Sequence, residues 1–192
     1  MIIGNEEIRD YEAVESIRKA VPAKSGGSIM KLHYEAVTDA LRQDVLALRT
    51  VKGQEGYIEP VSQCLEEACD DCRWRPVAIY DKDNIVGFAM YGYFLPEYPP
   101  DGRLWLDRLL IDARCQGKGY GKAAMSDLLH RLYREYPDRD KIYLSVIREN
   151  KAAISLYEQF GFAFSDERDT KGEYVMVKEL VNFNYGKYCT NR

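Results

Sequence analysis

The chain has 192 residues, which is the size of one globular domain with small appendages. Acidic residues outnumber basic ones by 31 to 27, for a net charge of −4, so the chain lacks the excess of cations that binds a nucleic acid backbone. No stretch approaches the roughly 20 apolar residues that a membrane-spanning helix needs. We therefore expect a protein that binds neither nucleic acid nor membrane.

The cysteines and histidines argue against disulfide chemistry and metal binding. The 5 cysteines, an odd number, are scattered and fit a reducing compartment better than a disulfide framework. Cys69 and Cys72 have the C-x-x-C spacing, but no second pair follows and the chain holds only 2 histidines, so zinc would lack ligands. The first ten residues include Glu6, Glu7 and Asp10, unlike the start of a signal peptide. These features predict a cytoplasmic protein without a metal.

The N-terminal part of the chain is predicted to hold helices around a single strand. Apolar residues at helical spacing indicate an amphipathic helix over residues 5–21, and the glycine- and serine-containing stretch 22–28 indicates a linker. A strand at 31–37 follows, and then two helices at 39–51 and 62–73.

The rest of the chain mixes strands and helices. In order, the patterns predict strands 75–80 and 85–94 joined by a turn at 81–84, strand 103–111, helix 121–136, strand 141–147, helix 150–160 and a hairpin over 162–180. This order indicates an α/β (α+β) fold, in which helices cover both faces of a mixed central sheet of about six to seven strands.

The segment between strand 103–111 and helix 121–136 has the composition of a phosphate-binding loop. Its glycines stand at positions 117, 119 and 121, where they allow a ligand to approach the backbone beside the free N–H groups of a helix start. A Walker loop is excluded because Gln116 and Ala123 occupy its Gly and Ser/Thr positions, and the G-x-G-x-x-G fingerprint is one residue longer. A glycine-rich turn without a ligand remains the alternative.

Two motifs make the chain resemble the GNAT family of N-acetyltransferases. The coenzyme A loop of that family matches Gln116-x-x-Gly119-x-Gly121, in preference to the register that starts at Arg114, because the last glycine then stands at the helix start. The second motif runs from Asn150 through Tyr157 to Phe162. Within the family the chain looks most like bacterial spermine/spermidine (diamine) acetyltransferases, on the stretches 86–92, 106–108 and 172–176.

The resemblance covers about residues 31–180, which it makes a GNAT domain. Residues 1–30 are then an N-terminal helical extension with its linker, and residues 181–192 a C-terminal tail. The family fold implies that the sheet splays between its fourth and fifth strands. It also implies direct transfer from acetyl-CoA to an amine, and the sequence agrees because Cys115 has no histidine nearby to activate it.

The resemblance also implies where acetyl-CoA binds. The pantetheine arm would pair with the backbone of Leu109, Leu110 and Ile111, and the amide of Leu110 would polarise the thioester carbonyl. The loop would hold the pyrophosphate with Gln116, Gly117, Lys118, Gly119, Tyr120, Gly121 and Lys122. Asn150 would face the coenzyme, although its place at a helix start is explained equally well by capping.

Tyr157 and Asp107 are the candidate catalytic residues. In the family motif, Tyr157 would be the general acid that protonates the departing thiolate, which requires either close positioning or a lowered pKa of the phenol. Alone, a tyrosine on an amphipathic helix is more often a core residue. Asp107 interrupts an apolar strand and would act as a base or position a water. Its alternative role is a salt bridge to Arg108 or Arg103.

The acceptor is expected to be a small-molecule amine, specifically a polyamine. Acidic residues stand where the family places its acceptor side, at Glu55, Glu59, Glu97 and Asp101, and would attract a polycation. The alternatives are another amine, such as a protein N-terminus or an aminoglycoside, and a protein that binds coenzyme A or a polyamine without turnover. A homodimer is expected by analogy with the family alone.

Overall fold

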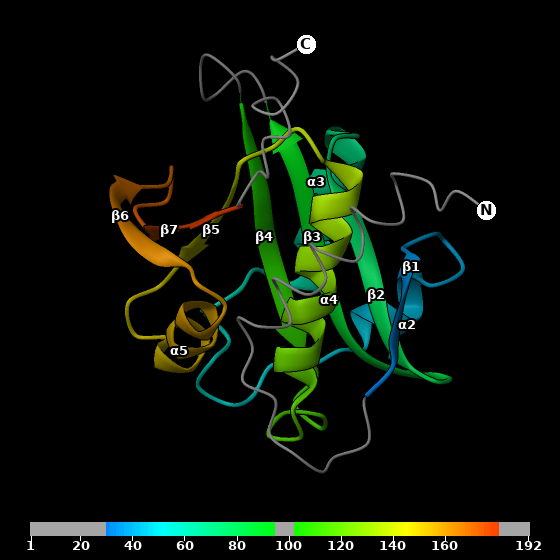
Figure 1. The fold of residues 1–192 in the computed structure, drawn as a ribbon. Helices are drawn as coiled ribbons and strands as arrows, with labels where there is room; N and C mark the ends of the chain where they lie inside the picture. Colours follow the sequence, from blue (N-terminus) through cyan, green and yellow to red (C-terminus); the bar gives the residue numbers. More distant parts are fainter. Residues whose placement is uncertain (1–29, 95–101, 181–192) are drawn as a thin grey trace, which may run out of the picture.

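A seven-stranded sheet forms the centre of the molecule, with strand order β1-β2-β3-β4-β5-β7-β6. Figure 1 shows the computed structural model, which describes residues 30–94 and 102–180. The strands are β1 (Leu32–Ala36), β2 (Arg75–Asp81), β3 (Asn84–Phe94), β4 (Arg103–Ile111), β5 (Lys141–Val146), β6 (Ala163–Arg168) and β7 (Tyr174–Glu179). Between them lie α2 (Arg42–Leu46), α3 (Val61–Asp70), α4 (Tyr120–Glu135) and α5 (Lys151–Gln159). The predicted order of elements is confirmed from residue 30 onward.

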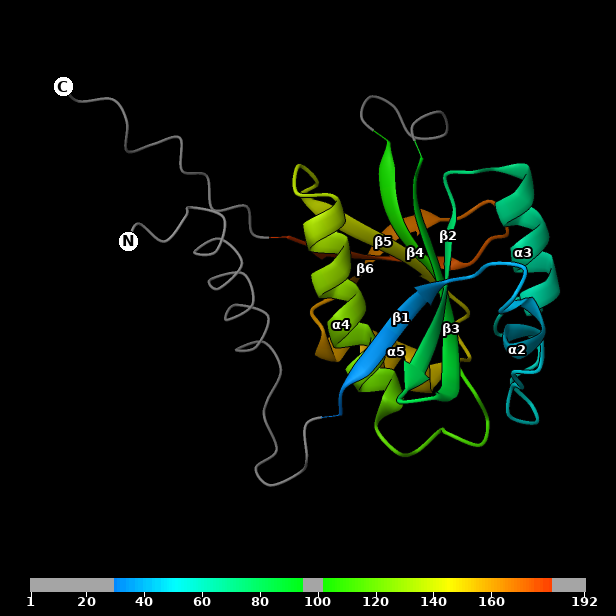
Figure 2. The ribbon, with the colours of Figure 1, turned by 90° about the vertical axis from the view of Figure 1, so that its right-hand side faces the viewer.

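Helices cover both faces of the sheet, as Figure 2 shows with the sheet nearly edge-on. Apolar residues of α4 and α5, among them Leu128 and Ile154, pack with one face of the strands. Residues of α2 and α3, among them Val45 and Cys64, pack on the opposite face. The alternation of side chains along each strand supplies both cores, which confirms the predicted layered α/β architecture.

The sheet opens between β4 and β5. These strands run parallel, but they pair only at Leu104 with Ile142 and at Trp105 with Tyr143. On its other edge β4 stays paired with β3 along its length, with a shift in register at Asp107, which has no partner residue on β3. This confirms the predicted splay between the fourth and fifth strands, and the edge of β4 beyond Trp105 is left without a neighbouring strand.

The predicted helix over 39–51 is shorter in the structure, where α2 covers only Arg42–Leu46. The reason is tertiary: the backbone N–H of Arg49 donates to the carboxylate of Asp112, and the Arg49 carbonyl accepts from the N–H of Ala113. Those backbone groups are therefore used to hold the loop after β4. The predicted helix over 5–21 lies outside the described residues. None of the described helices is long and apolar enough to cross a membrane.

Candidate active site

A cleft of about 390 Å³ lies where β4 and β5 separate. Its walls come from the chain before and along α3, from β4 and β5, from the start of α5 and from the turn between β6 and β7. Six carboxylate side chains line it against two cationic ones; these residues are Glu59, Glu67, Asp71, Asp107, Asp169 and Glu173, with Arg108 and Lys171. The cleft is therefore acidic.

Leu109, Leu110 and Ile111, at the free edge of β4, line the cleft. The N–H of Asp112 donates to the Val86 carbonyl on the β3 side at 2.9 Å. Backbone direction alternates along a strand, so the amide of Leu110 also faces β3, whereas those of Leu109 and Ile111 face the gap. The prediction that the Leu110 amide polarises the carbonyl is therefore wrong, and Leu109 and Ile111 are the available donors.

Asp112 anchors the loop that follows β4. Its side chain is fully buried and accepts hydrogen bonds from the Arg114 backbone at 2.8 Å and from Arg114 Nε at 2.7 Å. The hydrogen bonds of Arg114 hold the pKa of the Asp112 carboxyl below its usual range, although burial opposes them. The Asp112 carbonyl also accepts from the N–H groups of Cys115 and Gln116. A buried, ionised carboxylate thus fixes the start of the glycine loop.

Two of the three loop glycines adopt a backbone that disfavours side chains. Gly117 has φ +75° and Gly119 has φ +91°, and a Cβ atom at either position would meet nothing within 4 Å. Gly119 is the N-cap of α4, so Gly121 lies in the first helical turn, one residue further in than predicted. The space beside both glycines and the free N–H groups of the helix start fit a pyrophosphate.

The other loop side chains make contacts within the protein. Gln116 lines the cleft and donates from Nε2 to the Ile111 carbonyl at 3.1 Å. The Tyr120 hydroxyl donates to Asp81 at 2.6 Å, which ties the start of α4 to the end of β2. Lys118 is exposed and donates to the Arg114 carbonyl, and Lys122 is partly buried. Residues 117–122 do not line the cleft itself.

Helix α5 brings Asn150 and Tyr157 to the same cleft. Asn150 is the N-cap, and its side chain accepts from the Ala153 N–H at 3.2 Å, so the capping role is present at the cleft wall. Burial and the negative charge of Glu173 raise the pKa of Tyr157 to about 12. Of the two possibilities that the sequence left open, a lowered pKa does not apply, which leaves positioning as the way in which the phenol could serve as an acid.

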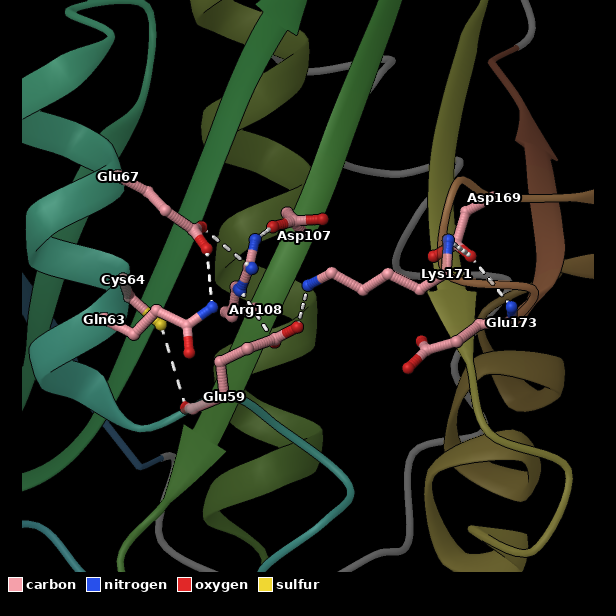
Figure 3. A network of polar contacts seen from close by, with 9 residues as sticks. All are labelled: Glu59, Gln63, Cys64, Glu67, Asp107, Arg108, Asp169, Lys171 and Glu173. Atoms are coloured by element: carbon pink, nitrogen blue, oxygen red, sulfur yellow. Dashed lines mark hydrogen bonds and ion pairs between the residues drawn. The ribbon is translucent and has the colours of Figure 1, made fainter.

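Arg108 joins the acidic residues of the cleft into one network, drawn in Figure 3. Its guanidinium is 5% exposed and donates from Nε to Glu59 at 3.1 Å and from Nη2 to Glu67 at 2.9 Å. It also pairs with Asp107. The salt bridge that the sequence left open for Asp107 is thus present, with Arg108 as the partner, while Arg103 pairs with Glu167.

Glu59 receives a second cation, because Lys171 on the opposite wall donates to it from Nζ. Burial acts to raise the pKa of Glu59, but the hydrogen bond of Lys171 and the charge of Arg108 outweigh it, so the pKa lies below its usual range. Glu59 is therefore held ionised in the wall of the cleft.

Residues 39–162 match the profile described as the acetyltransferase (GNAT) family. The match spans more than half of the chain. The chain belongs to the GNAT acetyltransferase family. This acetyltransferase is 47% identical over 154 residues to a spermine/spermidine N(1)-acetyltransferase of Bacillus subtilis (strain 168), in an alignment that covers 79% of the chain and 100% of the relative. It is 46% identical, with the same coverage, to a probable spermine N(1)-acetyltransferase of Bacillus subtilis subsp. natto.

Solved structures share the fold of this acetyltransferase. A spermidine N-acetyltransferase from Vibrio cholerae, in complex with CoA and spermine, has a TM-score of 0.58 at 19% identity and covers 78% of this chain and 94% of its own. The ribosomal-protein-S18-alanine N-acetyltransferase of Escherichia coli has a TM-score of 0.57 at 18% identity, covering 80% and 98%. These likenesses establish the fold, and their different names show that the fold alone does not fix the acceptor.

The acetyltransferase uses acetyl-CoA. The features described above fit that molecule: the unpaired edge of β4 can take hydrogen bonds from an extended arm, and the exposed glycines lie just beyond the end of that strand. Gln116, Asn150 and Tyr157 line the cleft beside the β4 edge.

The predicted acceptor residues have different positions in the acetyltransferase. Glu59 lines the cleft, whereas Glu55 is exposed, does not line it, and accepts from the Gly53 N–H at 2.7 Å. Glu97 and Asp101 lie outside the described residues.

Sequence reasoning missed several polar residues that line the cleft, among them Glu67, Asp169, Lys171 and Glu173. Only Glu67 carries a local signal, because it stands three residues after the buried Cys64 and so shares the inner face of α3. The other three follow from the position of the β6–β7 turn, which no short motif specifies.

Proposed function

We propose that this acetyltransferase transfers the acetyl group of acetyl-CoA directly to a primary amine of a polyamine, such as spermidine or spermine. The observation that carries the proposal is the acidic wall of the cleft, where Glu59, Glu67 and Asp107 gather around Arg108. A polyamine arrives protonated, and such a wall attracts several ammonium groups at once. The names of the two Bacillus subtilis relatives at 46–47% identity support the same acceptor.

The coenzyme side of the proposal uses backbone groups. Acetyl-CoA supplies an acetyl group activated as a thioester. The amides of Leu109 and Ile111 face the gap, and we assign the Leu109 amide to the thioester carbonyl because it lies nearer the point where β4 and β5 pair. Gly117, Gly119 and the first N–H groups of α4 would hold the pyrophosphate.

Tyr157 is the proposed general acid for the departing sulfur. With a pKa of about 12, the phenol stays protonated throughout the physiological range. Transfer of its proton to a thiolate of pKa near 8.5 is uphill by about 5 kcal/mol in the absence of other contacts. The tyrosine must therefore act through close positioning, with the proton moving as the carbon–sulfur bond breaks.

The attacking amine must first lose a proton, and two carboxylates of the cleft could accept it. Asp107, at the irregular position of β4, is the first candidate, acting directly or through water. Glu173 is the second, because burial and the charge of Asp169 raise the pKa of its carboxyl and make it a better base. Asp107→Asn and Glu173→Gln separate them, since the variant that lacks the base should lose the larger part of kcat.

Consumption of acetyl-CoA across a panel of amines tests the proposed function. The panel contains spermine, spermidine, a peptide with a free N-terminus and an aminoglycoside. We expect the highest kcat/KM with spermine or spermidine. Higher activity on the peptide or the aminoglycoside would show that the acceptor is not a polyamine. Binding of acetyl-CoA and spermine without turnover would show that the protein is a binding protein and not an enzyme.

We also propose that the protein acts as a cytoplasmic homodimer that binds neither nucleic acid nor membrane. The dimer rests on analogy with the family, and the net charge of −4 supports the lack of nucleic acid binding. Light scattering of the purified chain measures the oligomeric state, and a molecular mass of one chain would contradict the dimer.

A further inference from the structure

One cationic side chain reaches across the cleft from the wall opposite α3. Lys171 lies in the turn between β6 and β7, and its Nζ pairs with Oε1 of Glu59, a residue 112 positions earlier in the sequence. Figure 3 shows the extended lysine pointing from the hairpin toward the network of Arg108. The ion pair therefore bridges the two walls of the cleft.

The backbone under Lys171 is held in place by its own turn. Oδ1 of Asp169 accepts from the N–H of Lys171 at 2.9 Å and from the N–H of Glu173 at 2.8 Å. Gly172 closes the turn with φ +83° and donates to the Asp169 carbonyl at 3.0 Å. These hydrogen bonds thus fix the backbone position of Lys171 relative to the cleft, but they do not involve its side chain.

The two cations on Glu59 differ in how easily they can leave. Arg108 is 5% exposed and is held by three carboxylates, so its departure would strand buried charges. Lys171 is 49% exposed, and the ion pair with Glu59 is its only side-chain partner among the described residues. Exposed ion pairs of this kind are weak. A second ammonium group could therefore replace Lys171 on Glu59 but could not replace Arg108.

We propose that Lys171 occupies an ammonium subsite on Glu59, and that an acceptor with a second ammonium group binds there by displacing the lysine. The inference rests on the proposed function. The amine that attacks the thioester must be deprotonated, so a monoamine in its reactive form has no charge with which to compete. A polyamine keeps at least one further ammonium, which takes the place of the lysine.

The test compares Lys171→Met with the wild type on spermine and on butylamine. Removal of the competitor should lower KM for spermine by about threefold to fivefold, the range set by a weak ion pair, and leave KM for butylamine unchanged. Lys171→Arg keeps the charge and should retain the wild-type KM. Lys141→Met is the matched control, because Lys141 also pairs with a glutamate, Glu179 at 3.4 Å, but does not line the cleft.

A double-mutant cycle with Glu59→Gln shows whether the effect passes through Glu59. In the Glu59→Gln background, Lys171→Met should change KM for spermine less than it does alone, because the shared subsite is gone. An unchanged or higher KM for spermine in Lys171→Met, or an equal change in both backgrounds, would overturn the inference.

The affinity for spermine, measured by calorimetry without acetyl-CoA, should rank the variants in the same order as KM for spermine does. This measurement requires no turnover. A wild type that acetylates no polyamine would instead refute the proposed function, so the two failures are distinguishable. Circular dichroism of each variant checks that it is folded.

Discussion

The two sides of the cleft recognise their ligands with different parts of the chain. On the coenzyme side, the β4 edge and the glycine loop offer backbone N–H groups, fixed by the buried carboxylate of Asp112. On the acceptor side, Glu59, Glu67 and Asp107 offer charged side chains gathered around Arg108. Binding through backbone N–H groups tolerates substitution of most side chains, but it is disturbed when the backbone changes its conformation. Side-chain recognition responds to single charges and to salt, so the predictions below probe the two sides separately.

Loss of Arg108 should have the largest effect. Arg108→Met leaves three carboxylates without their shared cation, one of them on a central strand, and should lower the free energy of unfolding by about 3 kcal/mol. Urea denaturation followed by circular dichroism measures this change as a lower midpoint at an unchanged slope.

Glu67→Gln in the Arg108→Met background removes one of the stranded charges. It should restore part of the lost stability. If Arg108→Met alone has the same urea midpoint as the wild type, the network contributes no stability.

Tyr157→Phe tests the point where the two sides meet. The variant should lower kcat by about 100-fold with little change in either KM, because only the leaving-group proton is lost. Since the pKa of Tyr157 is raised to about 12, ionisation of this phenol should not reduce kcat of the wild type below about pH 11. Steady-state rates of the wild type and the variant between pH 6 and pH 10 measure the loss of kcat and its dependence on pH. Full activity of the variant would show that Tyr157 serves only in packing.

Gly119→Val tests the backbone side of the cleft. A branched side chain at φ +91° both strains the loop and fills the space beside the helix start, so KM for acetyl-CoA should rise about tenfold or more. Gly53→Val is the matched control, because Gly53 has φ +89°, has open space around it and lies outside the loop at the start of α4. Equal effects of both substitutions would show that strain alone is responsible.

The smallest expected effect is that of ionic strength, which should change KM for a polyamine more than KM for a monoamine. Screening of exposed charges over about 10 Å at 0.1 M salt weakens the attraction between a polycation and the acidic wall. KM for spermine should therefore rise a few-fold between about 0.05 M and 0.5 M salt, while KM for butylamine changes less. A KM for spermine that does not depend on salt would count against an electrostatic acceptor site.

The parts of the site that the sequence predicts are those encoded in short segments. The loop glycines and the motif from Asn150 to Tyr157 each depend on local spacing. The structure places Asn150 and Tyr157 at the β4–β5 opening and the loop glycines beyond the end of β4. The contacts of Glu59 could not be predicted, since Arg108 and Lys171 reach it from distant segments. Which amide of β4 faces the gap could not be predicted either, because it depends on the register of β4 with β3.

Secondary structure shows the same division between local and distant causes. Helices α4 and α5 begin within one residue of the predicted starts because capping and periodicity are local. Helix α2 is shorter than predicted because Arg49 is used by Asp112, a residue 63 positions later. Tertiary contact decides where a weak helix ends.

Strand β4 holds one residue more than its two hydrophobic faces require. Leu104 and Leu106 belong to the core beside α4, whereas Leu110 belongs to the core beside α3 and Ile111 returns to the first. The change from even to odd numbers occurs at Asp107, so a strand without that residue would alternate regularly and keep each apolar side chain in its present core. Asp107 is in this sense an insertion that packing does not need. A chain that lacks it should keep both cores and lose the bulge that lies next to the point where β4 and β5 part.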